Sequence, residues 1–133
     1  MENCIFCKII RGEIPSHKIY ETENTLTFLD IQPKTKGHLL TIPKKHHETI
    51  YDVPEEILFE IIKVNKKMSN LAKEKLKAKG VNIINSNEKT AQQEIPHIHF
   101  HTVPRYEEDG LNIWHREKKE EHDLKIIKEQ LLK

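Results

Sequence analysis

An excess of charge of one sign is missing from this chain. Its 22 lysines and arginines nearly balance 21 aspartates and glutamates, and the formal net charge is +1. We therefore expect neither nucleic acid nor a membrane surface as a partner, because both attract strongly charged proteins. No apolar run approaches the roughly 20 residues that span a bilayer. The first seven residues lack the charged and apolar regions of a secretory signal, so the sequence predicts a cytoplasmic protein.

Cysteine is also scarce, with two residues in 133. In a reducing compartment such cysteines serve as thiols or metal ligands more often than as a structural disulfide. Internal repeats, low-complexity stretches and linkers are missing from the sequence as well. A chain of this length and composition predicts one domain over residues 1–133, with one modest core.

Histidine, in contrast, is concentrated in one short stretch. His97, His99 and His101 alternate with apolar residues, and this spacing of two is the period of a strand. The three imidazoles are therefore predicted to share one face of a sheet. Imidazole suits nucleophilic and acid–base chemistry near neutral pH. The alternative is a polar sheet face of satisfied histidines without a chemical role.

The distances along a strand argue against one metal site for all three histidines. Neighbours at i and i+2 lie about 6.6 Å apart, and the outer pair lies about 13 Å apart. We therefore expect a division of roles among them. His38 follows Gly37 on an otherwise apolar stretch. It is either a core histidine with a polar partner or a further member of the same site.

Hydrophobic periodicity predicts the order of the elements. They are a short turn or helix (4–10), a hairpin (18–21 and 25–30), a buried strand (37–43), a long helix (54–79), a strand (81–85), the histidine strand (97–103) and a tail helix (117–132). We expect Asp52 to be the N-cap of the long helix and Gly80 to follow its end. Most strands are joined by loops too short for helical crossovers. The sequence therefore predicts an α+β fold with an antiparallel sheet.

The two cysteines form a Cys-x-x-Cys pair, Cys4 and Cys7. Two thiolates at this spacing can bind one zinc ion, with two imidazoles completing a tetrahedral set. His97, together with either His46 or His47, could supply the nitrogen ligands. The alternatives are two ordinary thiols and a redox dithiol. A redox dithiol calls for a thioredoxin-like βαβ context, and none is visible in the sequence.

With these motifs in place, the chain resembles the histidine-triad superfamily of nucleotide hydrolases and transferases. The motif His-x-His-x-His-x-x, with apolar x, matches residues 97–103. Further segments resemble the nucleoside phosphoramidase branch and cover nearly the whole chain, at 4–10, 28–31, 36–40, 42–46 and 104–106. The resemblance implies a five-stranded antiparallel sheet with one long helix and short terminal helices. It also implies a homodimer with one ten-stranded sheet.

The resemblance implies a role for each matching position. His99 would attack the α-phosphorus and carry a covalent nucleotide, while His101 and His38 would contact the phosphate. Asp30 would bind the ribose hydroxyls. The other implied nucleotide contacts are Phe6, Ile9, Phe28, Leu29 and Ile31 around the base, and Asn85, Gln93 and Glu94 near the sugar, phosphate or leaving group. A structural Zn²⁺ would be held by Cys4, Cys7, His46 and His97, which leaves His47 outside the set.

Two positions after the long helix depart from the commoner pattern of this family. Gln92 and Glu94 stand where many members carry glycine and serine. A carboxylate repels a phosphate unless it is protonated or paired with a cation, so we hypothesise that Glu94 favours amine leaving groups. Trp114 lies where related members place an aromatic near the partner's active site. The alternative is a surface aromatic covered by the tail helix.

The resemblance favours a purine nucleoside phosphoramidase that binds a purine nucleotide conjugate and releases AMP or GMP. One alternative is a dinucleoside polyphosphate hydrolase that uses the same nucleophile. The other is a non-catalytic, zinc-stabilised protein that binds nucleotides or acts as a scaffold.

Overall fold

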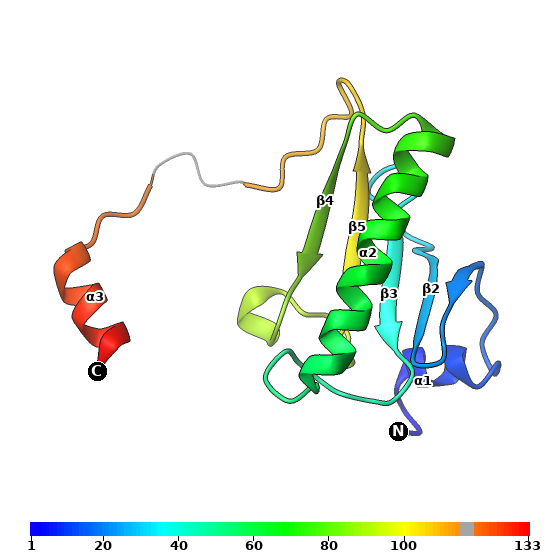
Figure 1. Ribbon diagram of the computed structural model, residues 1–133, viewed down its shortest axis with the longest axis horizontal. Helices are drawn as coiled ribbons and strands as arrows, with labels where there is room; N and C mark the ends of the chain where they lie inside the picture. The colour runs from blue at the N-terminus through cyan, green and yellow to red at the C-terminus, as the bar shows by residue number, and fades with distance from the viewer. Residues whose placement is uncertain (115–118) are drawn as a thin grey trace.

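The computed structural model describes residues 1–114 and 119–133, and its centre is one antiparallel sheet of five strands (Figure 1). The strand order is β1-β2-β3-β5-β4, and the long helix α2 packs across one face. The elements are α1 (Ile5–Ile10), β1 (Lys18–Glu21), β2 (Thr25–Leu29), β3 (Leu39–Pro43), α2 (Glu55–Leu76), β4 (Gly80–Asn85), a 3-10 turn (Lys89–Ala91), β5 (Phe100–Arg105) and α3 (Leu124–Leu132). The predicted α+β fold with an antiparallel sheet is confirmed.

The two faces of the sheet carry different apolar clusters. On one face, α2 buries Ile61 against Ile98 and Phe100 of the histidine segment, and it buries Val64 and Met68 against Leu39 of β3. On the other face, α1 packs its buried residues against β2 and β3; this cluster is Cys4, Phe6, Cys7, Ile9, Leu26, Phe28, Leu40 and Ile42. The alternation along residues 97–102 therefore sends the apolar side chains toward α2 and leaves the imidazoles on the α1 face.

Both predicted cap residues of the long helix are wrong, although its predicted start at residue 54 is within one residue of the observed one. The Asp52 carboxylate accepts hydrogen bonds from the Glu48 and Thr49 N–H groups, so it closes the preceding turn, and α2 begins after Pro54. At the other end, Lys77 adopts the left-handed conformation with φ 61°, and Ala78 N–H donates to the Ala72 carbonyl. The helix therefore stops before Gly80, which starts β4 instead.

The histidine strand begins later than the sequence pattern predicts. β5 starts at Phe100, and the preceding backbone bonds to loops rather than to a neighbouring strand. His97 N–H donates to the Ile95 carbonyl over 2.8 Å, and Ile98 N–H donates to the His47 carbonyl over 2.7 Å. The alternating directions of the side chains nevertheless continue through this segment. His97 and His99 therefore sit on irregular backbone whose position depends on its local partners.

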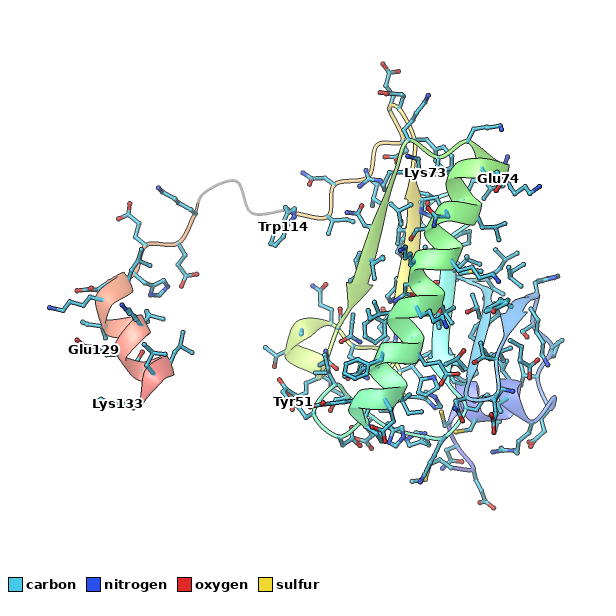
Figure 2. The ribbon with its side chains drawn as sticks, in the orientation of Figure 1. Tyr51, Lys73, Glu74, Trp114, Glu129 and Lys133 are labelled. Atoms are coloured by element: carbon cyan, nitrogen blue, oxygen red, sulfur yellow. The ribbon has the colours of Figure 1, made fainter. Side chains whose placement is uncertain are left out.

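The C-terminal part of the chain lies apart from the sheet (Figure 1). The predicted tail helix spanned 117–132; residues 117 and 118 lie outside the described part, and α3 begins after the N-cap Asp123. Its apolar residues Leu124 and Leu131 are 79 % and 78 % exposed. Figure 2 shows Trp114 away from both the sheet and α3, and its side chain is 88 % exposed. The tail helix therefore does not cover Trp114. Among the described residues, no helix has the length and apolar character that crossing a membrane requires.

Candidate active site and metal centre

Four imidazoles and one phenyl ring form a continuous group on the α1 face of the sheet. The His99 and His101 ring centroids lie 5.1 Å apart, and those of His101 and His38 also lie 5.1 Å apart. Phe6 of α1 stands edge-on to both His97 and His99, at centroid distances of 5.7 and 5.1 Å. The structure therefore places the three triad histidines on one face, as their spacing predicted, and brings His38, which the sequence left open, against His101.

Hydrogen bonding fixes the tautomer of His99. Its Nδ1 lies 2.8 Å from the His97 carbonyl oxygen, which can only accept, so Nδ1 carries the proton. The Nε2 atom of a neutral ring then keeps its lone pair. Burial lowers the pKa of His99 below its ordinary value and favours this neutral form. The segment is held further by Asn85, whose side-chain N–H donates to the His99 carbonyl over 3.1 Å.

A second hydrogen-bond chain fixes the tautomers of His38 and His101. The Lys34 backbone N–H donates to His38 Nδ1 over 3.1 Å, so a neutral His38 carries its proton on Nε2. This Nε2–H donates to His101 Nδ1 over 2.9 Å. His101 therefore carries its own proton on Nε2. Burial lowers the pKa of His38, and it lowers the pKa of His101 to about 4, so both rings are neutral at pH 7.

The predicted zinc ligands Cys4, Cys7, His46 and His97 also come together, with all four ligand atoms within 4.8 Å of one another. His97 Nδ1 lies 3.3 Å from Cys4 Sγ and 3.6 Å from Cys7 Sγ, and His46 Nδ1 lies 3.4 Å from Cys7 Sγ. Tetrahedral zinc with ordinary bond lengths separates sulfur and nitrogen ligands by about 3.6 Å. The separations of the donor atoms therefore fit a bound zinc ion.

The tautomer of His97 suits this metal centre. Its Nε2 lies 2.9 Å from the Pro43 carbonyl oxygen, so Nε2 carries the proton and the Nδ1 lone pair faces the two sulfurs. Burial lowers the pKa of His97 to about 4, which keeps the ring neutral as a ligand must be. Burial also raises the pKa of the Cys7 thiol, so a cation is needed to hold it as a thiolate. The structure distinguishes His46 from His47, because the Nδ1 of His46 joins the cluster, whereas the His47 carbonyl accepts from the Ile98 N–H.

Asp30, His38 and His101 form a second group of potential metal ligands within the same distance limit. Here the hydrogen bonds oppose a metal. The Lys34 N–H occupies the only lone pair of His38, so Nε2 holds a proton and cannot coordinate. Asp30 Oδ2 lies 3.6 Å from this Nε2. The group is better described as two hydrogen-bonded neutral imidazoles, each with its proton on Nε2, beside a carboxylate.

The apolar residues predicted around a base separate into three environments. Phe6, Ile9 and Phe28 are buried in one cluster on the α1 face, and the Phe6 and Phe28 rings lie 5.7 Å apart. Ile31 is 83 % exposed. Leu29 packs with Leu39, Val64 and Met68 on the α2 face, so its predicted place beside the base is wrong. Phe28 and Leu29 are consecutive on a strand, and only one of them can face the imidazoles.

The predicted contact of Gln93 with sugar or phosphate is also not supported. This side chain is buried, and its amide is taken up by the backbone. Its oxygen accepts from the Glu88 N–H, and its nitrogen donates to the Glu48 and Ile95 carbonyls. Gln93 therefore holds the loop that precedes the triad. Glu94, the next residue, is exposed, and its charge raises the pKa of His99 against the larger effect of burial.

Sequence reasoning missed the backbone groups that order the histidines. The Lys34 N–H sets the tautomer of His38, the Pro43 carbonyl sets that of His97, and the His97 carbonyl sets that of His99. No side-chain pattern marks such groups. The only signal for Lys34 was its place in the Pro-Lys-Thr-Lys loop before Gly37.

Comparison with known proteins places this geometry in a family. The HIT domain family matches residues 11–108. An adenosine 5'-monophosphoramidase from Candida albicans is 41 % identical over 84 % of this chain and 76 % of its own length. The structure of a HIT family member from Bacillus subtilis superposes with a TM-score of 0.86, at 38 % identity over 97 % of this chain and 94 % of that one.

A third similar protein bears on the metal centre. It is a zinc-bound histidine triad family protein from Mycobacterium smegmatis, 40 % identical over 88 % of this chain and 85 % of that one, with a TM-score of 0.81. Family match, identity and fold agree over most of the chain. The protein belongs to the HIT, or histidine-triad, family.

Proposed function

We propose that this protein is a purine nucleoside phosphoramidase, a nucleotide hydrolase that releases AMP or GMP through a covalent intermediate on His99. The observation that carries the proposal is the state of His99. Its Nδ1–H donates to a carbonyl, and its Nε2 lone pair has no hydrogen-bond partner among residues 1–114 and 119–133, beside a neutral pair of imidazoles. An imidazole in this state is a competent nucleophile. The similarity to a monophosphoramidase supports an amine as the leaving group.

The reaction balances with groups that the site contains. The His99 Nε2 lone pair attacks the α-phosphorus, and the bond from phosphorus to the leaving nitrogen breaks with its electron pair going to that nitrogen. The nitrogen of the bound phosphoramidate carries its proton before the bond breaks, so it departs as a neutral amine. The His101 Nε2–H is placed to donate a hydrogen bond to a phosphate oxygen. Water then attacks the phosphorus, and the bond to His99 breaks with its electron pair returning to Nε2. One water proton stays on the new P–OH group, the other goes to the departed amine through solvent, and the nucleoside monophosphate leaves.

The nucleotide-binding part of the proposal uses fewer residues than the sequence suggested. Phe6, Ile9 and Phe28 offer apolar surface beside His99, with Ile31 at its exposed margin. Asp30 lies next to His38 and remains the candidate for the ribose hydroxyls. Asn85, whose side-chain N–H donates to the His99 carbonyl, stays a candidate contact near the sugar and phosphate.

The metal in this proposal is a structural Zn²⁺ on Cys4, Cys7, His46 and His97. When bound, the ion would cross-link α1 to the triad segment. Its role would be structural, because four protein ligands leave no open coordination position for chemistry. The fit of the sulfur and nitrogen separations supports this assignment, as does the zinc-bound relative from Mycobacterium smegmatis.

We also propose a cytoplasmic homodimer joined through β4 into a ten-stranded sheet. β4 is an edge strand, and its Ile83 is 46 % exposed. The long helix α2 exposes Phe59 and Ile62, at 68 % and 51 %. An unpaired strand edge beside exposed apolar residues is a natural pairing surface. Sedimentation velocity tests this point, and a single monomeric species would refute it.

The decisive test is to trap the nucleotide on His99. The full chain is mixed with adenosine 5'-phosphoramidate, quenched within one turnover, and analysed by mass spectrometry of its peptides. We expect an adenylyl group on the peptide that contains His99. In His99→Ala both the adduct and turnover should disappear, while AMP binding measured by calorimetry persists. His17→Ala, a change in an exposed histidine outside the site, serves as the control. Retained turnover in His99→Ala would contradict the proposal.

A further inference from the structure

We infer that His97 is a positioning residue that couples the metal centre to the nucleophile. Its ring belongs to the metal-ligand cluster, and its carbonyl oxygen accepts the Nδ1–H of His99. Metal occupancy would then set how firmly His99 is held in the tautomer and orientation that attack phosphorus. Only the kinetic part of the test below rests on the proposed function.

The two connections of His97 run through one residue. On the ring side, Nε2 donates to the Pro43 carbonyl over 2.9 Å, while Nδ1 faces Cys4 and Cys7 at 3.3 and 3.6 Å. On the backbone side, the carbonyl lies 2.8 Å from His99 Nδ1. His97 is 0 % exposed, so ring and backbone cannot move independently of their surroundings.

The backbone of His97 has little support from the sheet. β5 begins three residues later, and the His97 N–H donates to the Ile95 carbonyl, within its own bend. The carbonyl of a residue inside a strand is fixed by the ladder, whereas this one has two anchors outside it. The Ile98 N–H of the same peptide plane donates to the His47 carbonyl over 2.7 Å, and the His97 ring is held by Pro43 and the two sulfurs. The ring contacts of His97 therefore contribute to where the acceptor for His99 lies.

Helix α1 provides a second route for the same coupling. The cluster draws two of its ligands from this short helix and its N-cap, Cys7 and Cys4, and Phe6 lies between them in the sequence. The Phe6 ring stands edge-on to both the His97 and His99 rings. A bound metal would link α1 to His97 and would thereby hold the Phe6 ring against His99. Without the metal, only packing holds the Phe6 ring against His97 and His99.

The expected change in kcat follows from the hydrogen bond between His99 Nδ1 and the His97 carbonyl. A neutral imidazole divides between two tautomers, and one backbone hydrogen bond shifts such a balance by about three- to tenfold. A ratio that falls from about ten to one to about even leaves roughly half of the rings in the attacking tautomer. We therefore expect removal of the metal to lower kcat by about twofold, while KM for the nucleotide stays nearly constant. Substrate contacts on Asp30 and Phe28 lie outside the cluster, so binding depends less on the metal.

The experiment compares zinc-loaded and zinc-stripped full-length protein that is folded by circular dichroism. Long-range ¹H–¹⁵N spectra of the histidine rings report the His99 tautomer directly and need no turnover. In zinc-loaded protein we expect the Nδ1–H form alone. In stripped protein we expect a mixture or a broadened signal, together with the loss of kcat. Readdition of zinc should restore both.

Two variants keep the outcome interpretable. Val64→Ala destabilises the core on the α2 face, so it controls for lost stability and should leave the His99 tautomer unchanged. If the stripped native chain unfolds, zinc is titrated into His46→Asn, which keeps three ligands and holds the metal less tightly. There the tautomer signal and kcat should follow occupancy together.

An unchanged His99 tautomer in folded, metal-free protein would overturn the coupling, as would an unchanged kcat. If even the zinc-loaded protein fails to cleave adenosine 5'-phosphoramidate, the proposed function fails, and the tautomer comparison still decides the role of His97.

Discussion

Replacing Gly37 by alanine tests how the loop before β3 carries His38 into the site. Gly37 has φ +85°, a left-handed conformation that side chains disfavour. A Cβ built there also overlaps Leu76 Cδ1 at the end of α2. The substitution therefore combines backbone strain with overpacking, and both effects lower the free energy of unfolding.

The two contributions can be estimated separately. A left-handed backbone costs a non-glycine residue about 1–2 kcal/mol. Overpacking typically costs about 1–3 kcal/mol. The lower end applies here, because Leu76 is half-buried and borders a cavity of about 380 Å³ into which its methyl group can move. We expect Gly37→Ala to lose about 2–3 kcal/mol in total.

Gly12→Ala is the matched control, since Gly12 has φ +79° and no atom within 4 Å of its added Cβ. It should lose only the strain, about 1–2 kcal/mol. The change in unfolded-chain entropy is common to both variants and cancels in the comparison. Urea denaturation gives both values, and adding Leu76→Ala to Gly37→Ala should recover about 1 kcal/mol of coupling. Equal losses at the two glycines, or no coupling to Leu76, would refute the steric reasoning.

Two further predictions concern the charges around the nucleophile. Burial lowers the pKa of His101 from its ordinary 6.5 to about 4 in the folded protein. Between these two pH values the unfolded chain binds more protons than the folded one. The free energy of unfolding should therefore fall as the pH drops from 6.5 to 4. In His101→Gln with saturating zinc, the urea midpoint should fall less between pH 7 and pH 4.5, and an identical slope would count against a buried neutral His101. Glu94→Ser should lower the ratio of adenylyl-amine to dinucleoside polyphosphate cleavage, because an exposed carboxylate beside His99 repels a polyphosphate leaving group. The two rates measured side by side decide this, and an unaltered ratio would dismiss the hypothesis for Glu94.

The errors of the sequence analysis share one cause. Asp52 is a residue type that suits an N-cap, yet its carboxylate closes the turn before α2. Gly80 is a residue type that suits a helix end, yet it starts β4. Leu29 is adjacent to Phe28 and apolar, yet it faces α2. Gln93 is polar and close to the triad, yet the backbone takes up its whole amide. In each case residue type described what the side chain could do, whereas strand direction and available partners decided what it does.

The sequence by itself determined the fold class, the face that the histidines share and the candidate metal cluster, in which His46 and His47 stayed alternatives. These depend on local periods and spacings: two for a strand, three and four for a helix, and Cys-x-x-Cys for two ligands on one turn. Only the tertiary structure decided the protonation pattern. The Lys34, Pro43 and His97 backbone groups order the imidazoles, and they reach them from separate loops and strands. A backbone group has the same chemistry at every position, so only the folded chain shows which ones meet a histidine ring.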